Sequence, residues 1–201
     1  MSVTLSERPQ VEDPGIHDLL KHRKSLRAYA DKNVEADKIR RVFEAARWAP
    51  SASNEQPWHF IVATKDNPED HVRVLSAIKE GNQTWAKHAP VLIITVASKV
   101  RADGRENRHA FYDVGQAVAH LSVQALEEGL YLRQMGGFDA DKARELLGIP
   151  EGSEPVTAIA LGYPGDPETL PEQLREREAA PRTRKALSEI VFVGQWGTGL
   201  E

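Results

Sequence analysis

Apolar positions along the chain follow two spacings. Spacings of three and four residues place apolar side chains on one helical face, whereas short apolar runs bounded by turn residues indicate strands. Three helices are predicted over the ranges Glu35–Trp48, Arg108–Glu128 and Glu172–Glu178. Three more are predicted from their starts alone, at Asp13-Pro14, at Asn67 and after Asp139. The predicted strands are Trp58–Thr64, Pro90–Ala97, Leu130–Gln134 and Val156–Tyr163. Because helices and strands alternate, a single layered domain is the simplest interpretation.

Local signals fix several element ends. Asn67 and Asp139 have side chains suited to cap a helix N-terminus, and Gly129 is suited to end one. The Arg108–Glu128 helix is apolar over more than half of its circumference, with Phe111 in its stripe, and should run through the core. On the helix after Asn67, we expect Val72 to face inward with Leu75 and Ile78.

The C-terminal region contains an isolated apolar segment. Ile190–Val193 favours a strand, yet it follows a long polar stretch. This segment either docks on its own sheet or extends to another subunit, because an unpaired exposed strand invites aggregation. The pattern therefore favours a dimer with exchanged arms.

Composition excludes several classes of protein. The chain has 201 residues, no cysteine and a formal net charge of −4. It therefore has no disulfide framework and no thiolate metal site, and its charge gives no reason to expect nucleic acid or an anionic membrane as partner. No apolar signal segment occurs at the N-terminus, so we expect a soluble, cytoplasmic protein. Residues 1–12 should form a flexible extension, and residues 13–201 a single domain.

The loop from Pro50 to Trp58 is the most informative stretch. It reads Pro-Ser-Ala-Ser-Asn-Glu-Gln-Pro-Trp, with two prolines that restrict the backbone and side chains that donate and accept hydrogen bonds. Such a rigid polar loop beside an aromatic ring suits a planar heterocycle. The alternative is a solvated connector, and composition alone does not separate the two.

Four further segments are candidates for binding. Arg23-Lys24-Ser25-Leu26-Arg27 could clamp a phosphate, or could cap the carbonyls of a helix end. Gly136-Gly137 would let a ligand approach main-chain amides, or simply form a turn. Arg182-Thr183-Arg184 is a second anion-binding candidate, or a solvated basic stretch. In Gly81–Trp85, Asn82 could bind the edge of a heterocycle, or the segment is another loop.

Common catalytic and metal motifs are missing from the sequence. The seven histidines form no His-x-x-x-His pair, so we predict no metal site. The chain also lacks a Gly-x-Gly-x-x-Gly motif, a P-loop and a Gly-x-Ser-x-Gly elbow.

Taken together, the candidate segments resemble the FMN-dependent nitroreductase family, in the family's order from about Ile16 to Trp196. Its Arg-Arg-Ser-x-Arg motif is similar to Arg23–Arg27, and its Ala-Pro-Ser-x-x-Asn-x-Gln-Pro-Trp motif to Ala49–Trp58. The remaining matches are Asn82-Gln83, Ala89-Pro90, Tyr112–Gly115, Gly129-Leu130, Gly136–Asp139 and Arg182-x-Arg184.

The resemblance implies an α+β fold in which helices flank a mixed sheet, and an intertwined homodimer with FMN at the subunit interface. It implies that Arg23, Ser25, Arg182 and Arg184 hold the phosphate, and that Arg27 lies toward the pyrimidine end of the flavin. Asn82 would bind the ring edge, and Gly136 and Gly137 would offer amides near N5. Ser51, Ala52 and Asn54 would reach across from the partner subunit. The full set of implied FMN contacts is Arg23, Lys24, Ser25, Arg27, Pro50, Ser51, Ala52, Asn54, Asn82, Gln134, Met135, Gly136, Gly137, Arg182 and Arg184.

The implied reaction is ping-pong electron transfer from NADH or NADPH to a nitroaromatic, quinone or other flat acceptor, with no essential acid or base from the protein. One position departs from the family, because Trp85 stands where some members carry a lysine near the flavin. This departure leaves Arg27 as the main candidate cation beside the ring. Two alternatives stay open: a specialised reductive or dehydrogenase reaction on the same fold, and flavin binding without turnover.

Overall fold

The computed structural model describes residues 15–200. The helix start at Asp13-Pro14 and the extension over residues 1–12 therefore lie outside the described residues. The chain divides into two compact units, and the boundary between them in the sequence falls between Leu170 and Pro171.

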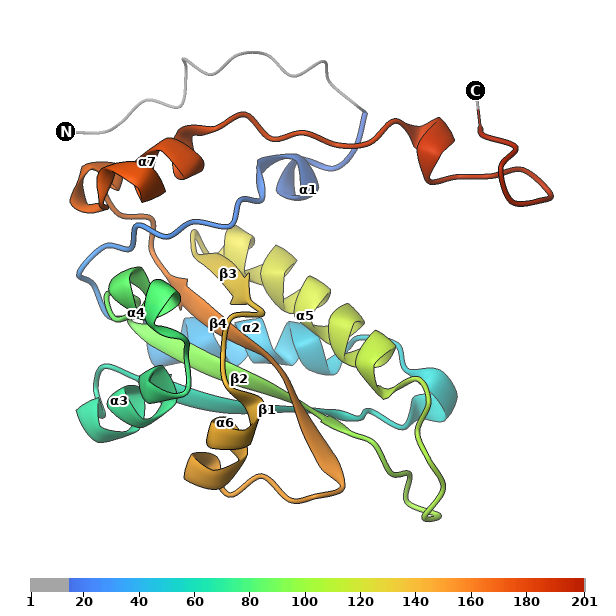
Figure 1. Cartoon of the computed structure of the whole chain (residues 1–201), viewed down its shortest axis with the longest axis horizontal. Helices are drawn as coiled ribbons and strands as arrows, with labels where there is room; N and C mark the ends of the chain where they lie inside the picture. Colours follow the sequence, from blue (N-terminus) through green and yellow to red (C-terminus); the bar gives the residue numbers. More distant parts are fainter. Residues whose placement is uncertain (1–14, 201) are drawn as a thin grey trace. The chain divides into compact units, whose positions relative to one another are not determined.

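A four-stranded sheet forms the centre of the first unit (Figure 1). Its strands are β1 (Trp58–Thr64), β2 (Val91–Ser98), β3 (Tyr131–Met135) and β4 (Ser153–Gly162), in the order β1-β2-β4-β3. All three pairings are antiparallel, so the prediction of a mixed sheet is wrong for the described strands. A mixed sheet needs at least one parallel pair, and the four described strands form none.

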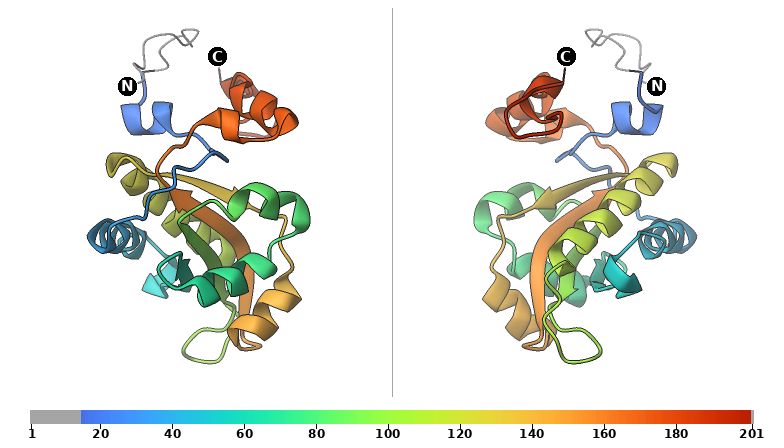
Figure 2. Two further views of the ribbon diagram at one scale, coloured as in Figure 1. Left: turned by 90° about the vertical axis from the view of Figure 1, so that its left-hand side faces the viewer. Right: turned by 90° about the vertical axis from the view of Figure 1, so that its right-hand side faces the viewer.

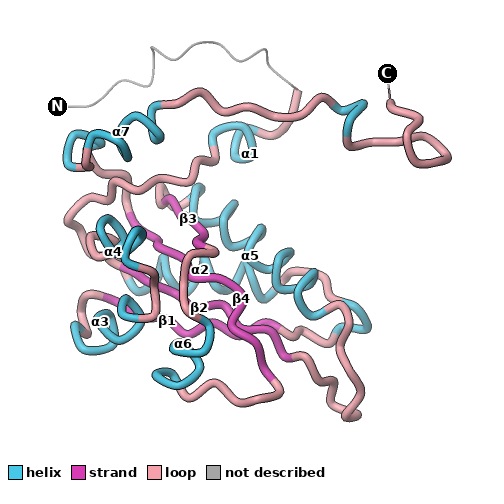
Figure 3. Tube along the Cα trace, viewed as in Figure 1, coloured by secondary structure: helices cyan, strands magenta, loops and turns pink. Residues whose placement is uncertain are grey.

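Helices cover both faces of this sheet (Figures 2 and 3). On one face lie α2 (Ala36–Arg47) and α5 (Ala110–Glu127); on the other lie α3 (Pro68–Ser76), α4 (Glu80–Ala86) and α6 (Ala140–Leu147). A short helix, α1 (Asp18–His22), precedes them. The main core lies between the sheet and the α2–α5 layer, and includes Val42, Trp58, Ile93, Val114, Leu121, Ile159 and Leu161. Within residues 15–200, no helix has both the length and the apolar character needed to cross a bilayer.

The predicted helix signals operate as expected. The side chain of Asn67 accepts a hydrogen bond from Asp70 N at the start of α3, and Asp139 accepts one from Lys142 N at the start of α6. Gly129 follows the last residues of α5 with a φ of 75°, the left-handed conformation that glycine adopts without steric cost. The strand β1 also has the predicted bounds. These element ends determine where the connecting loops begin.

Two inward-facing positions were predicted wrongly. Phe111 is 49% exposed and Val72 is 61% exposed, whereas Val114 and Val74 are buried. Because successive helical residues are turned by about 100°, the buried stripe passes beside these two residues. The Gly81–Trp85 segment is also helical, as part of α4, rather than the loop that its composition suggested.

The second unit contains α7 (Glu172–Ala179) and the 3₁₀ turn η3 (Leu187–Glu189). None of the residues of α7 is buried, as its charge pattern predicted. The expected strand at Ile190–Val193 is limited to an isolated bridge between Phe192 and Gly199. Ile190, Val191 and Val193 remain exposed in the described chain, as does Trp196 at 90%, whereas Phe192 is half-buried.

Candidate functional site

The basic segment Arg23–Arg27 is fastened to the sheet through its backbone. Arg133 on β3 donates from Nη1 to the carbonyl oxygen of Ser25 at 2.7 Å. Within the segment, Arg23 Nη1 donates to Ser25 Oγ at 3.3 Å. The hydroxyl of Tyr29 lies 3.2 Å from the carbonyl oxygen of Leu26 and 3.0 Å from that of Ala160, so it can donate to either. These bonds hold the segment above the β3–β4 edge.

Trp85 supports this arrangement from the interior. Its side chain is 1% exposed, and its ring stacks with Tyr29 at 6.4 Å between centroids. The guanidinium carbon of Arg133 lies 5.7 Å from the centroid of the Trp85 ring. Trp85 is therefore a buried platform rather than part of a ligand-facing surface, and Arg133 adds a cation beside the Arg23–Arg27 segment.

A second contact joins α4 to the end of β3. Asn82 Nδ2 donates to the carbonyl oxygen of Gly137 at 3.2 Å, and the amide of Lys79 donates to the same oxygen at 3.0 Å. A methyl group at Gly137 would lie only 2.6 Å from Asn82 Nδ2. This close approach explains why the position requires glycine if Asn82 is to keep its place.

The loop after Ala49 has unusual backbone angles. Ser53, Asn54 and Gln56 have φ values of 53°, 56° and 46°, a left-handed conformation that costs about 1–2 kcal/mol per non-glycine residue. Ser51 Oγ accepts a hydrogen bond from Gln56 N at 3.0 Å, which closes the loop. Left-handed residues of this kind gather at functional sites, where the surrounding structure maintains the strain.

A buried carboxylate anchors this loop. Asp113, in the first turn of α5, is 1% exposed and accepts a hydrogen bond from Ala52 N at 3.1 Å. Trp58, by contrast, packs in the main core. The ring at the end of the loop therefore serves the fold, not a ligand.

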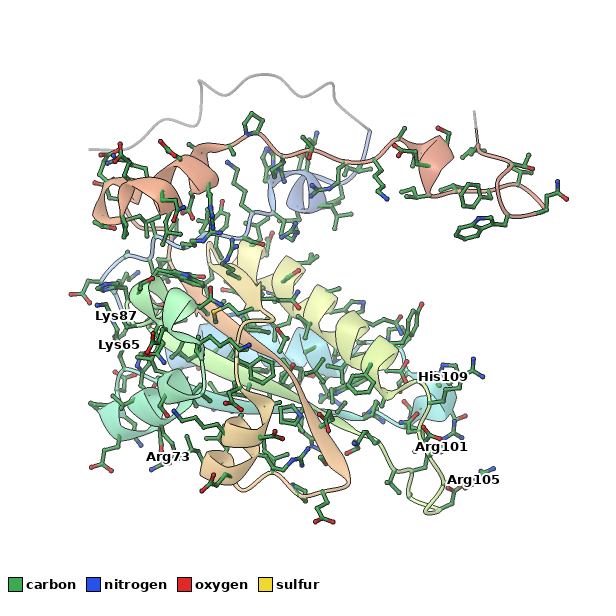
Figure 4. The ribbon with its side chains drawn as sticks, in the orientation of Figure 1. Lys65, Arg73, Lys87, Arg101, Arg105 and His109 are labelled. Carbon is green, nitrogen blue, oxygen red and sulfur yellow. The ribbon has the colours of Figure 1, made fainter. Side chains whose placement is uncertain are left out.

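The loop of residues 50–57, which contains the left-handed residues, is called the strained loop from here on. A second loop, between β2 and α5, lies close to it. Figure 4 shows Arg101, Arg105 and His109 along this connection. The hydrogen bond and charge of Asp103 raise the pKa of the Arg105 guanidinium, and the charge of Glu55, in the strained loop, adds to this effect. The ion pair of Arg105 with Asp103 lowers the pKa of the Asp103 carboxyl, so both groups are charged at neutral pH.

Comparisons with known proteins identify the family of this chain. The Nitroreductase family model matches residues 20–163, which include the basic segment, the strained loop and both glycines. The chain belongs to the nitroreductase family. It is therefore a member of a family of oxidoreductases.

Individual known proteins also match the chain over most of their own length. A crystal structure described as an oxidoreductase containing FMN is 34% identical, with a TM-score of 0.89, over 98% of this chain and 100% of that chain. An uncharacterized protein of Mycolicibacterium smegmatis is 36% identical, over 66% of this chain and 88% of its own length. A protein of Archaeoglobus fulgidus, provisionally named an NADH dehydrogenase/NAD(P)H nitroreductase, is 30% identical over 72% of this chain and 82% of its length.

The structure brings some of the residues that the nitroreductase resemblance predicted close together and leaves others apart. The Ser25 carbonyl bonds to Arg133 on β3, Arg23 bonds to Ser25, and Asn82 bonds to Gly137 just after the same strand. At that end Met135 is buried, whereas Gln134 and Gly136 are exposed; Lys24 and Arg27 are half-buried. Pro50, Ser51, Ala52 and Asn54 are held instead at the start of α5.

Arg182 and Arg184 belong to the second unit, on the exposed stretch between α7 and η3. The side chain of Arg184 donates to the carbonyl oxygen of Thr183 at 2.6 Å. Within residues 15–200, no group of three or more His, Asp or Glu side chains is placed to hold a metal ion.

The sequence-based prediction gave no role to two residues that support the candidate site, Arg133 and Asp113. Arg133 is a charge within a short strand between Leu132 and Met135, both buried, and a lone charge in such a strand is a signal for a specific partner. Asp113 is a carboxylate on the buried stripe of α5, and buried carboxylates are nearly always hydrogen-bonded. Neither signal identifies the hydrogen-bond partner. The tertiary structure shows that the partners are the Ser25 carbonyl and the Ala52 amide.

Proposed function

We propose that this chain is an FMN-dependent oxidoreductase that takes electrons from NADH or NADPH. Membership of the nitroreductase family supports this function, as does the 34% identity to an oxidoreductase that contains FMN. The hydrogen bond between Asn82 and Gly137 carries most weight, because it joins two predicted ring-binding residues that are 55 positions apart.

The residues at the end of β3 fit a flat ring. Gly136 and Gly137 carry no side chain that would keep a ring away from the main chain, and a Cβ at Gly137 would displace Asn82. Because its Nδ2 is committed to Gly137, Asn82 can turn its Oδ1 toward an N–H group on the edge of the ring. Gln134 and Met135 would complete this side.

The basic residues fit a phosphate monoester. Arg23 and Ser25, with Lys24 beside them, present a guanidinium, a hydroxyl and an ammonium within three residues. In this proposal Arg182 and Arg184 close the phosphate site from the C-terminal segment. Arg27 would lie toward the pyrimidine end, where a cation stabilises the anionic reduced ring.

We infer a homodimer in which each site uses both subunits. The strained loop, with Pro50, Ser51, Ala52 and Asn54, would cover the flavin of the partner. The exposed side chains of Ile190, Val193 and Trp196 support this arrangement, because large apolar surfaces on one protomer commonly mark an interface.

When bound, FMN would accept hydride at N5 from NADH or NADPH and pass the electrons to a nitroaromatic, a quinone or a similar flat acceptor in a ping-pong cycle. The protein would supply binding and orientation. Arg23 and Ser25 would hold the phosphate, Asn82 would fix the ring edge, and the strained loop would limit access of water. No side chain of the chain is required as an acid or a base.

The visible spectrum of the purified protein tests this function. We expect a flavin absorption band, present as purified or after FMN is added, that bleaches when NADH or NADPH is mixed in without oxygen. A protein that stays colourless with added FMN would refute flavin binding. A flavin band that neither nucleotide bleaches would instead indicate a binding protein without this reaction.

A further inference from the structure

We propose that Arg133 is a positioning residue for the phosphate end of the flavin site. This inference rests on the proposed function, since it assigns a role within the FMN site. Arg133 acts through the Arg23–Arg27 segment, whose place on the sheet it sets.

The bond that Arg133 makes goes to the main chain of the phosphate-binding segment. Its Nη1 lies 2.7 Å from the carbonyl oxygen of Ser25, across 108 residues of sequence. A charge-assisted bond of this length is among the stronger hydrogen bonds in proteins. Because the acceptor is a carbonyl, the bond orients the backbone; Ser25 Oγ, which accepts from Arg23, keeps its own hydrogen to donate to a ligand.

The guanidinium of Arg133 is itself held in place. It lies 5.7 Å from the centroid of the Trp85 ring, and Trp85 is buried against Tyr29. Stacking on an aromatic face is attractive for a guanidinium and leaves its N–H edges free to donate. The hydroxyl of Tyr29 adds a contact to the carbonyl of Leu26, so these side chains hold two consecutive carbonyls of the stretch, those of Ser25 and Leu26.

Arg133 also relates the phosphate segment to the ring segment. It lies on β3, the strand that continues directly into Gly136 and Gly137. A flavin mononucleotide has a fixed covalent path from ring to phosphate, so the two segments must keep a set spacing. Arg133 fixes that spacing, because it belongs to the ring-binding strand and bonds to the phosphate-binding segment.

Comparing FMN with riboflavin tests this role, because riboflavin has the same ring without the phosphate. In Arg133→Met, which keeps an apolar stem and removes the donors, we expect FMN affinity to fall about tenfold and riboflavin affinity to stay within about twofold of the wild type. Arg133→Lys retains a charge and a donor, and should recover part of the loss. Arg73→Met, on the exposed surface of α3, is the control for loss of an arginine.

The outcomes separate this role from a purely structural one. Thermal unfolding of each apo-protein reports whether a variant folds. If FMN and riboflavin affinities fall equally, or if neither falls while the wild type binds FMN, Arg133 does not position the phosphate segment. A wild-type protein that binds neither flavin would overturn the FMN function itself, and this inference with it.

Discussion

The backbone amide of Ala52 donates a 3.1 Å hydrogen bond to the carboxylate of Asp113, which lies 61 residues later. The donor precedes three non-glycine residues in left-handed conformations, and the acceptor is a buried side chain on the longest helix. Strained backbone persists only where surrounding contacts determine it. We therefore regard Asp113 as the residue that couples the shape of the strained loop to the core.

Replacing Asp113 tests this coupling. Asp113→Ala removes the acceptor and should lower the free energy of unfolding by about 1–3 kcal/mol, because it leaves the amide of Ala52 without its partner. Asp113→Asn keeps an acceptor oxygen and should lose less. Hydrogen exchange of the Ala52 amide, followed by NMR, should accelerate in Asp113→Ala. Unchanged exchange at that amide would show that Asp113 does not hold the loop.

Strain in the loop can be measured at Gln56. Glycine adopts a φ of 46° without steric cost, so Gln56→Gly should be more stable to unfolding than Gln56→Ala by about 1 kcal/mol. Both variants lose the side-chain bond from Gln56 Nε2 to the carbonyl of Asn54, so this loss cancels in the comparison. In an unstrained helix alanine is the better residue. Greater stability of Gln56→Ala would therefore rule out strain at this position.

Most of the fold could be predicted because local signals specify it. The caps at Asn67 and Asp139, and the apolar runs of β1 and β2, depend on neighbouring residues alone. The helix α4 was harder to recognise, because Gly81–Trp85 is polar and contains a glycine. Its helical form is stabilised by tertiary contacts, such as the burial of Trp85.

The candidate site was predictable as a set of segments but not as a geometry. Family order placed Ser25, Asn82 and Gly137 in one site, and the structure joins Asn82 to Gly137 directly. The supporting roles of Arg133 and Asp113 depend on contacts over more than 60 residues of sequence, which no local pattern encodes. The prediction of a strand at Ile190–Val193 was wrong for the described chain. The segment favours a strand by composition, but it pairs with no strand there.

Gly165 allows the segment around Tyr29 to run beside β4. A Cβ at Gly165 would lie 2.5 Å from the carbonyl oxygen of Tyr29 and 2.8 Å from Ala30 N, and backbone atoms cannot rotate away. We expect Gly165→Ala to lower the free energy of unfolding by about 1–3 kcal/mol. The control is Gly152→Ala, where the nearest atom is a side-chain carbon of Val100 at 3.8 Å. Equal stability of the two variants in urea would contradict the close approach.

Acid should weaken the fold through Glu35. The hydroxyl of Tyr163 donates to Glu35 Oε2 at 2.6 Å and, with Lys32 close by, lowers the pKa of Glu35 from 4.5 to about 2. Because this pKa is lower in the folded protein, the stabilisation is complete above pH 4.5 and is lost as pH falls toward 2. Tyr163→Phe keeps the ring but should raise the pKa of Glu35 toward 4.5, as measured by NMR titration of its carboxyl carbon. Stability should then fall less steeply over this range, and an unchanged titration would exclude the bond.

Asn82 and Gly137 should behave as a unit in flavin binding. A methyl group at Gly137 would lie 2.6 Å from Asn82 Nδ2, which must then move because it is the end of a flexible side chain. We expect Gly137→Ala to weaken FMN binding by about 1–3 kcal/mol with little loss of stability, because the displaced carboxamide no longer meets the ring edge. Asn82→Ala should cost a similar amount. In a double-mutant cycle the variant with both changes should bind FMN as Asn82→Ala does, since the methyl group then has nothing to displace. Additive losses would instead show that the methyl group acts on the flavin directly, independently of Asn82.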